Sequence, residues 1–212
     1  MNKVILYIDG ENLRHYIKDV FRENNVSVDD PSLLNINFGK LFDKLLKGFE
    51  VNEKVYYCAK LRQNKETSKK SKELIQKQRI LKTKLEREGF SFIMSGNVRA
   101  QRVEDGKKTK LVFREKGVDV KIAVDLVVAA CDKKVKTVIL CSSDSDLQPA
   151  VEEVKSRGVE VVYVGFEINP NKGLIYTTSR AILVRNSEVM ECFDKNQDDF
   201  LKFKKVQKSR RK

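Results

Sequence analysis

The sequence has few of the residues that build zinc sites or histidine-based catalytic sites. It contains a single histidine, His15, no tryptophan, and four cysteines that form no CxxC pair. These absences argue against a zinc site, and we expect His15 on a helix surface rather than as a catalytic base. Three of the cysteines lie in apolar segments, which is typical of reduced thiols in a cytosolic protein.

Long apolar runs and nucleotide-binding loops are also missing. No run approaches the roughly 18 apolar residues of a membrane span, and the N-terminus lacks the small-residue cleavage site of a signal peptide. No GxGxxG follows the first predicted strand and no GxxxxGK[ST] occurs, so the usual phosphate-cradling loops are absent. We therefore expect a cytoplasmic protein with no membrane partner.

Positive charge, by contrast, is abundant. The 212 residues include 43 Lys and Arg against 30 Asp and Glu, a formal net charge of +13, while 41% of the residues are hydrophobic. There is enough apolar material for a core, and the charge excess favours a polyanionic partner, nucleic acid before an anionic membrane. The alternative is that the lysines serve only solubility.

Strand and helix patterns alternate along the chain, which predicts an α/β fold with a parallel sheet and helices on both faces. The predicted strands lie at about 4–8, 55–59, 90–94, 137–140 and 159–164, with a further short strand at 181–184 left open. The predicted helices lie at about 13–21, 38–46, 68–87, 118–130 and 147–154. A β-hairpin is predicted at 97–114, with its turn at 104–107.

Acidic side chains stand where predicted strands end or helices begin. Asp9 ends the first strand, Asp119 begins a helix, and Asp144 and Asp146 follow the fourth strand. The carboxyl ends of parallel strands meet at one edge of a sheet. Like charges gathered there would raise one another's pKa unless a divalent cation such as Mg²⁺ bound them. Such an ion can activate a water and stabilise a phosphodiester transition state. The alternative is that each acid is a helix N-cap.

Four further residues could support this site. Asn12, one turn into the first helix, could hydrogen-bond a carboxylate, a water or a phosphate, or could be a helix-start residue only. Asp125 points about 120° away from Asp119 on the same helix, so it approaches from another angle or pairs with a lysine. Ser142 and Ser143 could orient Asp144 or contact a phosphate, although simple turn chemistry is the expected role of Ser143.

The basic residues are clustered in three places. These are the amphipathic helix predicted at 68–87, the hairpin at 97–114, and a tail at 194–212. Lys and Arg contacts to phosphates give salt-dependent affinity with little sequence preference, although a solvated helix face is the alternative. The candidate nucleic-acid contacts are Lys69, Lys70, Lys72, Arg99, Arg102, Lys107, Lys108 and Lys116.

Three segments together resemble the NYN domain of the LabA/DUF88 type, a branch of the PIN-like nuclease superfamily. The segments are YIDGEN at 7–12, KGVDVKIAVD at 116–125 and SSDSDLQP at 142–149. The resemblance covers roughly residues 3–166, and Ser143 stands where the family usually has glycine.

The resemblance implies a three-layer αβα sandwich around a five-strand parallel sheet of order 3-2-1-4-5. The hairpin and the basic helix would be insertions in a domain of residues 1–193, followed by the tail at 194–212. The resemblance also implies acidic ligands for Mg²⁺ or Mn²⁺ and a single-stranded or structured RNA substrate. The matching acidic positions are Asp9, Asp119, Asp144 and Asp146, Asn12 matches the family asparagine, and Asp125 matches a frequent family acid.

These observations support a metal-dependent endoribonuclease as the first hypothesis. The second is a non-catalytic RNA-binding or scaffold protein that retains the fold. A metal-dependent phosphohydrolase of small substrates ranks last, since it would leave the basic helix and tail without a purpose. The sequence leaves RNA versus DNA undecided and a homodimer open.

Overall fold

Strand β1 (Lys3–Asp9) lies in the middle of a seven-stranded sheet and is apolar on both faces. In the computed structural model, which describes residues 3–27, 34–63, 68–105 and 108–194, Leu6 and Ile8 pack into one hydrophobic cluster. Ile5 and Tyr7 pack into a second cluster on the opposite face. Helices cover both faces of this strand, which explains why its sequence is a continuous apolar run rather than an alternating one. The side chains of residues 99–114 lie outside the description.

The sheet has the order β4-β3-β2-β1-β5-β6-β7, and every neighbouring pair is parallel except β3 and β4. The other strands are β2 (Val51–Lys60), β3 (Phe90–Asp105), β4 (Lys108–Lys116), β5 (Val135–Cys141), β6 (Glu160–Phe166) and β7 (Arg180–Val184). The predicted α/β class is confirmed, and β3-β2-β1-β5-β6 run in the predicted order 3-2-1-4-5. The prediction of a five-strand, wholly parallel sheet was wrong.

Two features account for the extra strands. The third predicted strand does not end at Met94: β3 is 16 residues long and ends at Asp105, so its second half carries the hairpin into the same sheet as an antiparallel pair. At the other edge, β7 pairs with β6. Most residues of β7 are exposed, since an edge strand has a neighbouring strand on one side only. A short, partly polar edge strand gives a weak sequence signal.

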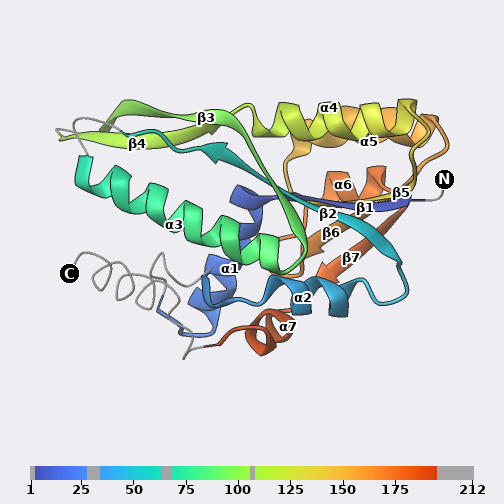
Figure 1. The fold of residues 1–212 in the computed structure, drawn as a ribbon, viewed down its shortest axis with the longest axis horizontal. Helices are drawn as coiled ribbons and strands as arrows, with labels where there is room; N and C mark the ends of the chain where they lie inside the picture. Colours follow the sequence, from blue (N-terminus) through green and yellow to red (C-terminus); the bar gives the residue numbers. More distant parts are fainter. Residues whose placement is uncertain (1–2, 28–33, 64–67, 106–107, 195–212) are drawn as a thin grey trace.

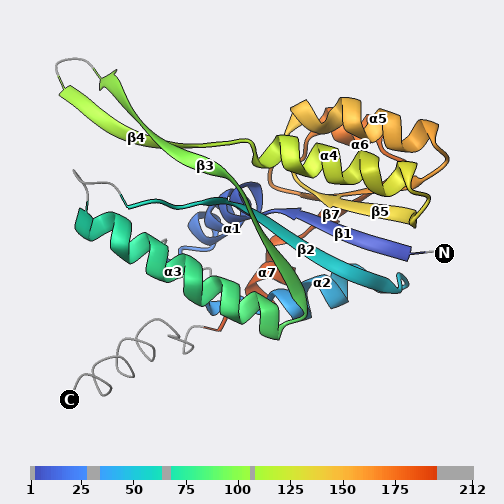
Figure 2. The same ribbon diagram turned by 45° about the horizontal axis from the view of Figure 1, so that its top comes forward.

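The helices form one layer on each side of the sheet (Figure 1, Figure 2). The first layer contains α1 (Gly10–Glu23), α2 (Phe38–Leu45), α3 (Ser68–Arg87) and α7 (Asn186–Glu191). The second contains α4 (Val118–Cys131), α5 (Gln148–Ser156) and α6 (Lys172–Thr177). The bounds predicted for the basic helix α3 are confirmed, whereas α7 was not predicted.

The two arms of the hairpin meet at a pair of glycines beside the start of α4. Gly96 has a φ of +71°, and a Cβ there would overlap the backbone carbonyl of Lys116. Gly117, with a φ of +90°, precedes α4 in the left-handed conformation. Glycine is therefore required at position 96 both for its backbone angle and for the close approach of the returning arm.

Some predictions fall outside the described residues: part of the loop at 24–31, the hairpin turn at 106–107, and the tail from residue 195. None of the described helices is long and apolar enough to cross a membrane. All four cysteines are free thiols, and His15 is an exposed helix residue beside Glu11, as predicted.

Candidate metal centre

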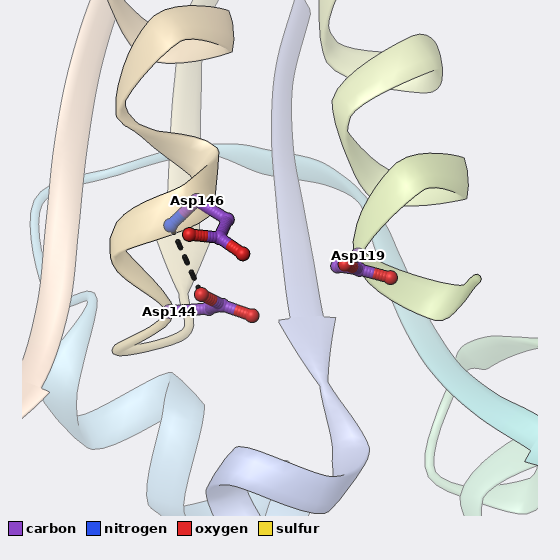
Figure 3. Close-up of side chains that lie close together, drawn as sticks. All are labelled: Asp119, Asp144 and Asp146. Carbon is purple, nitrogen blue, oxygen red and sulfur yellow. Dashed lines mark hydrogen bonds between the residues drawn. The ribbon is translucent and has the colours of Figure 1, made fainter. Parts of the chain in front are cut away.

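Three carboxylates from two distant parts of the chain meet at the carboxyl ends of the central strands. Asp119 lies in the first turn of α4, Asp144 follows β5, and Asp146 lies in the short 3-10 helix η2 (Ser145–Leu147). One oxygen from each carboxylate lies within 4.8 Å of the others. Figure 3 shows Asp144 and Asp146 facing Asp119 across the end of β1.

The backbone around Asp144 explains how its side chain is oriented. Asp144 is the N-cap of η2, and its Oδ1 accepts a hydrogen bond from the backbone N–H of Asp146 at 3.0 Å. Helix capping, the alternative raised for these acids, is therefore real for Asp144. Within the described part of the chain no donor is recorded for its Oδ2, so capping leaves this oxygen available.

Asp119 is placed by the start of α4 rather than by a side-chain cap. The N-cap position of this helix is Gly117, which has no side chain to satisfy the first N–H groups. The N-terminus of a helix carries a partial positive charge, which favours a carboxylate in the first turn. Asp119 is half-buried, as is Asp144, and Asp146 is exposed.

Asp9 lies beside this cluster but is buried and held by other groups. Its Oδ1 accepts the backbone N–H groups of Glu11 and Asn12, both at 3.1 Å. Its Oδ2 accepts the amide of Asn12 at 2.7 Å and the hydroxyl of Ser142 at 3.1 Å. Burial raises the pKa of Asp9, and these hydrogen bonds act in the opposite direction. Asp9 is not part of the group of three, so its role as a direct metal ligand stays a prediction.

The register between β1 and β5 explains this arrangement. Ile8 pairs with Cys141, so Asp9 comes beside Ser142, and Asp144 lies two residues further along. The hydroxyl of Ser142 also accepts the backbone N–H of Asp144 at 3.2 Å. Asn12, Asp9, Ser142 and Asp144 thus form one hydrogen-bonded chain from α1 to the metal centre.

Ser143 is held from the opposite side by two residues that the sequence did not indicate. Its hydroxyl hydrogen-bonds the hydroxyl of Tyr163 at 2.8 Å, and its carbonyl accepts the amide of Asn171 at 2.9 Å. The hydroxyl of Tyr163 also accepts the backbone N–H of Asn171. Tyr163 reads in the sequence as an ordinary core residue of a strand, so no signal pointed to this supporting role.

Asp125 does not join the cluster. Its two oxygens accept the ammonium of Lys121 at 2.5 Å and the hydroxyl of Tyr57 at 2.7 Å. Of the two alternatives predicted for Asp125, the structure therefore contains the pairing with a lysine. By contrast, no ion pair to Asp119, Asp144 or Asp146 occurs among the described residues.

The three-acid cluster suits a hard divalent cation. Mg²⁺ binds oxygen at about 2.1 Å in octahedral geometry, so two of its ligands lie roughly 3.0 Å apart when adjacent and roughly 4.2 Å apart when opposite. The oxygens of Asp119, Asp144 and Asp146 all lie within 4.8 Å of one another and would draw closer to reach these spacings around one ion. Because the acids are partly exposed, water can complete the coordination.

The predicted nucleic-acid contacts are divided between α3 and the hairpin. Lys69, Lys70 and Lys72 are exposed near the start of α3, and Lys116 is exposed at the end of β4. Arg99, Arg102 and Lys108 occupy register positions on the hairpin, whereas Lys107 lies outside the described residues. Further along α3, Lys77 and Lys82 form ion pairs with Glu73 and Glu86. The start of α3 therefore presents its charge to solvent more than its middle does.

Comparisons with known proteins bear on the family and the fold. The model of the NYN domain matches residues 3–184. A crystal structure of a protein of unknown function from Vibrio parahaemolyticus is similar in fold, with a TM-score of 0.59 and 20% sequence identity. The similarity covers 86% of this chain and 93% of that one. No curated protein matches the sequence. The chain belongs to the NYN domain family, a branch of the PIN-like nuclease superfamily.

Proposed function

We propose that the protein is a metal-dependent endoribonuclease that hydrolyses RNA phosphodiester bonds. The observation that carries this proposal is the cluster of Asp119, Asp144 and Asp146 at the carboxyl ends of the strands. The cluster has no cationic partner among the described residues, in a chain whose formal net charge is +13. Three neighbouring carboxylates with no lysine or arginine partner are unexpected in a positively charged protein. Their arrangement is typical of a metal-binding site.

Asp119, Asp144 and Asp146 would hold Mg²⁺ or Mn²⁺. Such an ion, when bound, lowers the pKa of a water molecule and stabilises the charge that develops on a phosphodiester in the transition state. An acidic cluster repels a phosphate unless a cation is present. The carboxylates that hold the cation would therefore also determine where the scissile phosphate can bind.

The surrounding residues hold the ligands in position. Asp9 and Asn12 act through Ser142, whose hydroxyl accepts the backbone N–H of Asp144. Residues that orient metal ligands commonly affect metal affinity or activity 10- to 100-fold when they are changed. The assignment of Asp9 as a direct ligand remains an alternative within this proposal.

Binding of the RNA is assigned to the basic residues of α3 and of the hairpin. The exposed lysines at the start of α3, the cationic residues of the hairpin and the exposed Lys116 at its base would contact phosphates and give affinity that falls with salt. We place this chemistry in a domain of residues 1–193, with the basic tail at 194–212 as a further contact.

The test is cleavage of a labelled RNA by the purified protein in Mn²⁺. We expect internal cuts that leave 5′-phosphate ends and that stop in excess EDTA. Cleavage that persists in excess EDTA would contradict the metal-dependent mechanism. Salt-sensitive binding that never leads to cleavage would instead support the non-catalytic RNA-binding alternative.

A further inference from the structure

A mostly apolar cavity lies between α3, the start of α1 and strands β2 to β4. Its volume is about 240 Å³, somewhat below the roughly 300 Å³ at which pockets for drug-sized ligands begin. The apolar side of the lining includes Leu61, Leu74, Leu81 and Phe92. Phe92 stacks on the buried ring of Tyr56, at 5.4 Å between ring centroids and 12° between planes. The cavity thus offers a flat aromatic surface and room for one small ring system.

One carboxylate in the lining of this cavity has an unused oxygen. The Oε1 of Glu115 is buried and has no hydrogen-bond partner among the described residues. Its carboxyl group accepts a backbone N–H from Ala59. Burial, and next the charges of Glu11 and Asp9, raise the pKa of Glu115 to about 7. A buried acceptor without a donor costs free energy. Because this oxygen is covered by protein atoms, the carboxylate would have to turn toward the cavity to accept an N–H group of a ligand, and that hydrogen bond would relieve the cost.

The other polar groups of the lining narrow the chemistry of this ligand. Glu11 is paired with Arg14, and Gln78 donates its amide to the carbonyl of Ala59 at 2.7 Å. The lining also contains two cations, and each is paired with a carboxylate: Arg14 with Glu11 and Lys77 with Glu73. Glu115 has no cationic partner among the described residues, which disfavours a phosphate, and the apolar walls disfavour a bare metal ion. A wholly apolar ligand would leave Oε1 of Glu115 without a donor. A flat heterocycle with N–H donors on one edge satisfies all three conditions.

The cavity is close to the metal centre along the chain. Gly10, in its lining, directly follows Asp9. Glu115, also in the lining, precedes Asp119 by four residues, so their α-carbons are at most about 14 Å apart. A nucleotide near the cleaved phosphate could therefore place its base in the cavity.

We propose that this cavity is a nucleobase pocket for the RNA and that it prefers guanine. Guanine presents two adjacent N–H donors on its Watson–Crick edge, which match an ionised carboxylate that only accepts. Uracil presents a single donor flanked by two carbonyl oxygens, which would face the carboxylate unfavourably. The inference rests on the proposed function for the identity of the polymer, but it concerns binding and not cleavage.

The test measures binding in EDTA at pH 8, where cleavage is not expected and Glu115 is largely ionised. The probes are fluorescently labelled oligouridines that differ in one central base: guanine, inosine or uracil. We expect the wild-type protein to bind the guanine oligonucleotide roughly tenfold more tightly than the uracil one, with inosine between them because it lacks the exocyclic amine. Equal affinities for all three oligonucleotides would overturn the proposal.

Three variants locate the preference. Glu115→Gln removes the negative charge and replaces one acceptor oxygen by an NH2 donor at nearly the same size, and it should abolish the preference for guanine. Leu74→Trp fills the cavity and should do the same, with its thermal unfolding measured to verify that it folds. Glu152→Gln removes an equal charge from the exposed surface of α5 and should keep the preference. A preference that survives in Glu115→Gln contradicts the assignment.

The outcome separates this inference from the nuclease proposal. A guanine preference in binding with no cleavage in Mn²⁺ supports the pocket and contradicts the enzyme. Metal-dependent cleavage with no base preference in binding supports the enzyme and contradicts the pocket.

Discussion

Two sets of aspartates on or near α4 differ in how their charge is balanced. Asp125, six residues after Asp119, has both oxygens occupied by Lys121 and Tyr57. Asp119, Asp144 and Asp146 lie together without any ion pair to the described residues. Cations are abundant throughout the chain, so the difference does not follow from composition. The fold pairs the charge of Asp125 with a lysine and leaves the charges of the three-acid cluster without a cationic side chain in the ranges that the structure describes.

The largest expected effect comes from removing one acid of each kind. Asp144→Asn should lower the rate of RNA cleavage by at least about 100-fold, because a lost metal ligand should cost no less than a residue that only orients one. Asp125→Asn makes the same chemical change at an aspartate outside the cluster and should lower the rate of cleavage less than tenfold. Single-turnover cleavage in Mn²⁺ measures both. Similar losses in the two variants would remove the functional distinction between the two sets.

Metal binding should also raise the thermal stability of the folded protein. An ion that binds only the folded protein stabilises it by about 2.7 kcal/mol when its concentration is 100 times its dissociation constant. For a chain of this size that corresponds to a rise in Tm of roughly 5–10 °C. Thermal unfolding with increasing Mn²⁺ should show this rise in the wild type and in Asp125→Asn but not in Asp144→Asn. A rise of equal size in all three proteins would place the ion elsewhere.

Gly96, where the hairpin arms come together, can be compared with Gly48, where an added Cβ would contact no atom within 4 Å. Gly96→Ala introduces both a strained backbone angle and an overlap with the carbonyl of Lys116, so we expect a loss of roughly 2 kcal/mol or more. Gly48→Ala has a φ of +100° but no atom within 4 Å of the added Cβ. Its loss should be about 1 kcal/mol.

Chemical denaturation measures both losses, and the metal affinity of Gly96→Ala reports whether Asp119 has moved. Equal losses in the two variants would show that only the backbone angle matters at position 96. In that case the contact with Lys116 would not help to position Asp119.

The smallest expected effect concerns a third kind of acid, the half-buried Glu115. Its pKa of about 7 in the folded protein exceeds the ordinary value of 4.5, so the folded state keeps a proton that the unfolded state loses. The stabilisation is therefore present below pH 4.5 and is lost as the pH rises through 7. Because the group is partly exposed, we expect only about 1 kcal/mol, or roughly 2–4 °C in Tm.

Glu115→Gln should therefore raise the Tm at pH 8 and leave it nearly unchanged at pH 5. Glu152→Gln is the control at both pH values, since it removes the same charge from an exposed position. A Tm that does not rise at pH 8 in Glu115→Gln would show that ionised Glu115 carries no cost.

Local sequence signals predicted some parts of the molecule closely. The apolar stripe of α3 and Gly89 beyond it gave the observed bounds Ser68–Arg87. The convergence of Asp119 with Asp144 was predicted from their places at a helix start and a strand end, although Asp119 follows the antiparallel strand β4, to which the parallel-strand rule does not apply. The partnership of Asp9 with Ser142 was not predictable, because it depends on the register of two strands 133 residues apart.

Other features left no distinct pattern in the sequence. The continuation of β3 past Met94 depends on pairing first with β2 and then with β4, and no single residue marks that change. The cavity beside Glu115 exists only because α3 lies over β2 to β4, so nothing in the sequence singled out the carboxylate of Glu115. Side-chain burial of this kind is decided by packing between elements.

The pairing of Asn97 with Lys116 fixes the base of the hairpin, and the pairs from Val98–Glu115 to Asp105–Lys108 extend from it. Shortening both arms by the same even number of residues would keep every remaining side chain on its present face, since side chains alternate along a strand. The start of α4 would stay where it is. If the hairpin contacts RNA as proposed, the length of that contact can thus be varied without altering the spacing of the three carboxylates, and footprints from a series of such truncations would test the proposed contact.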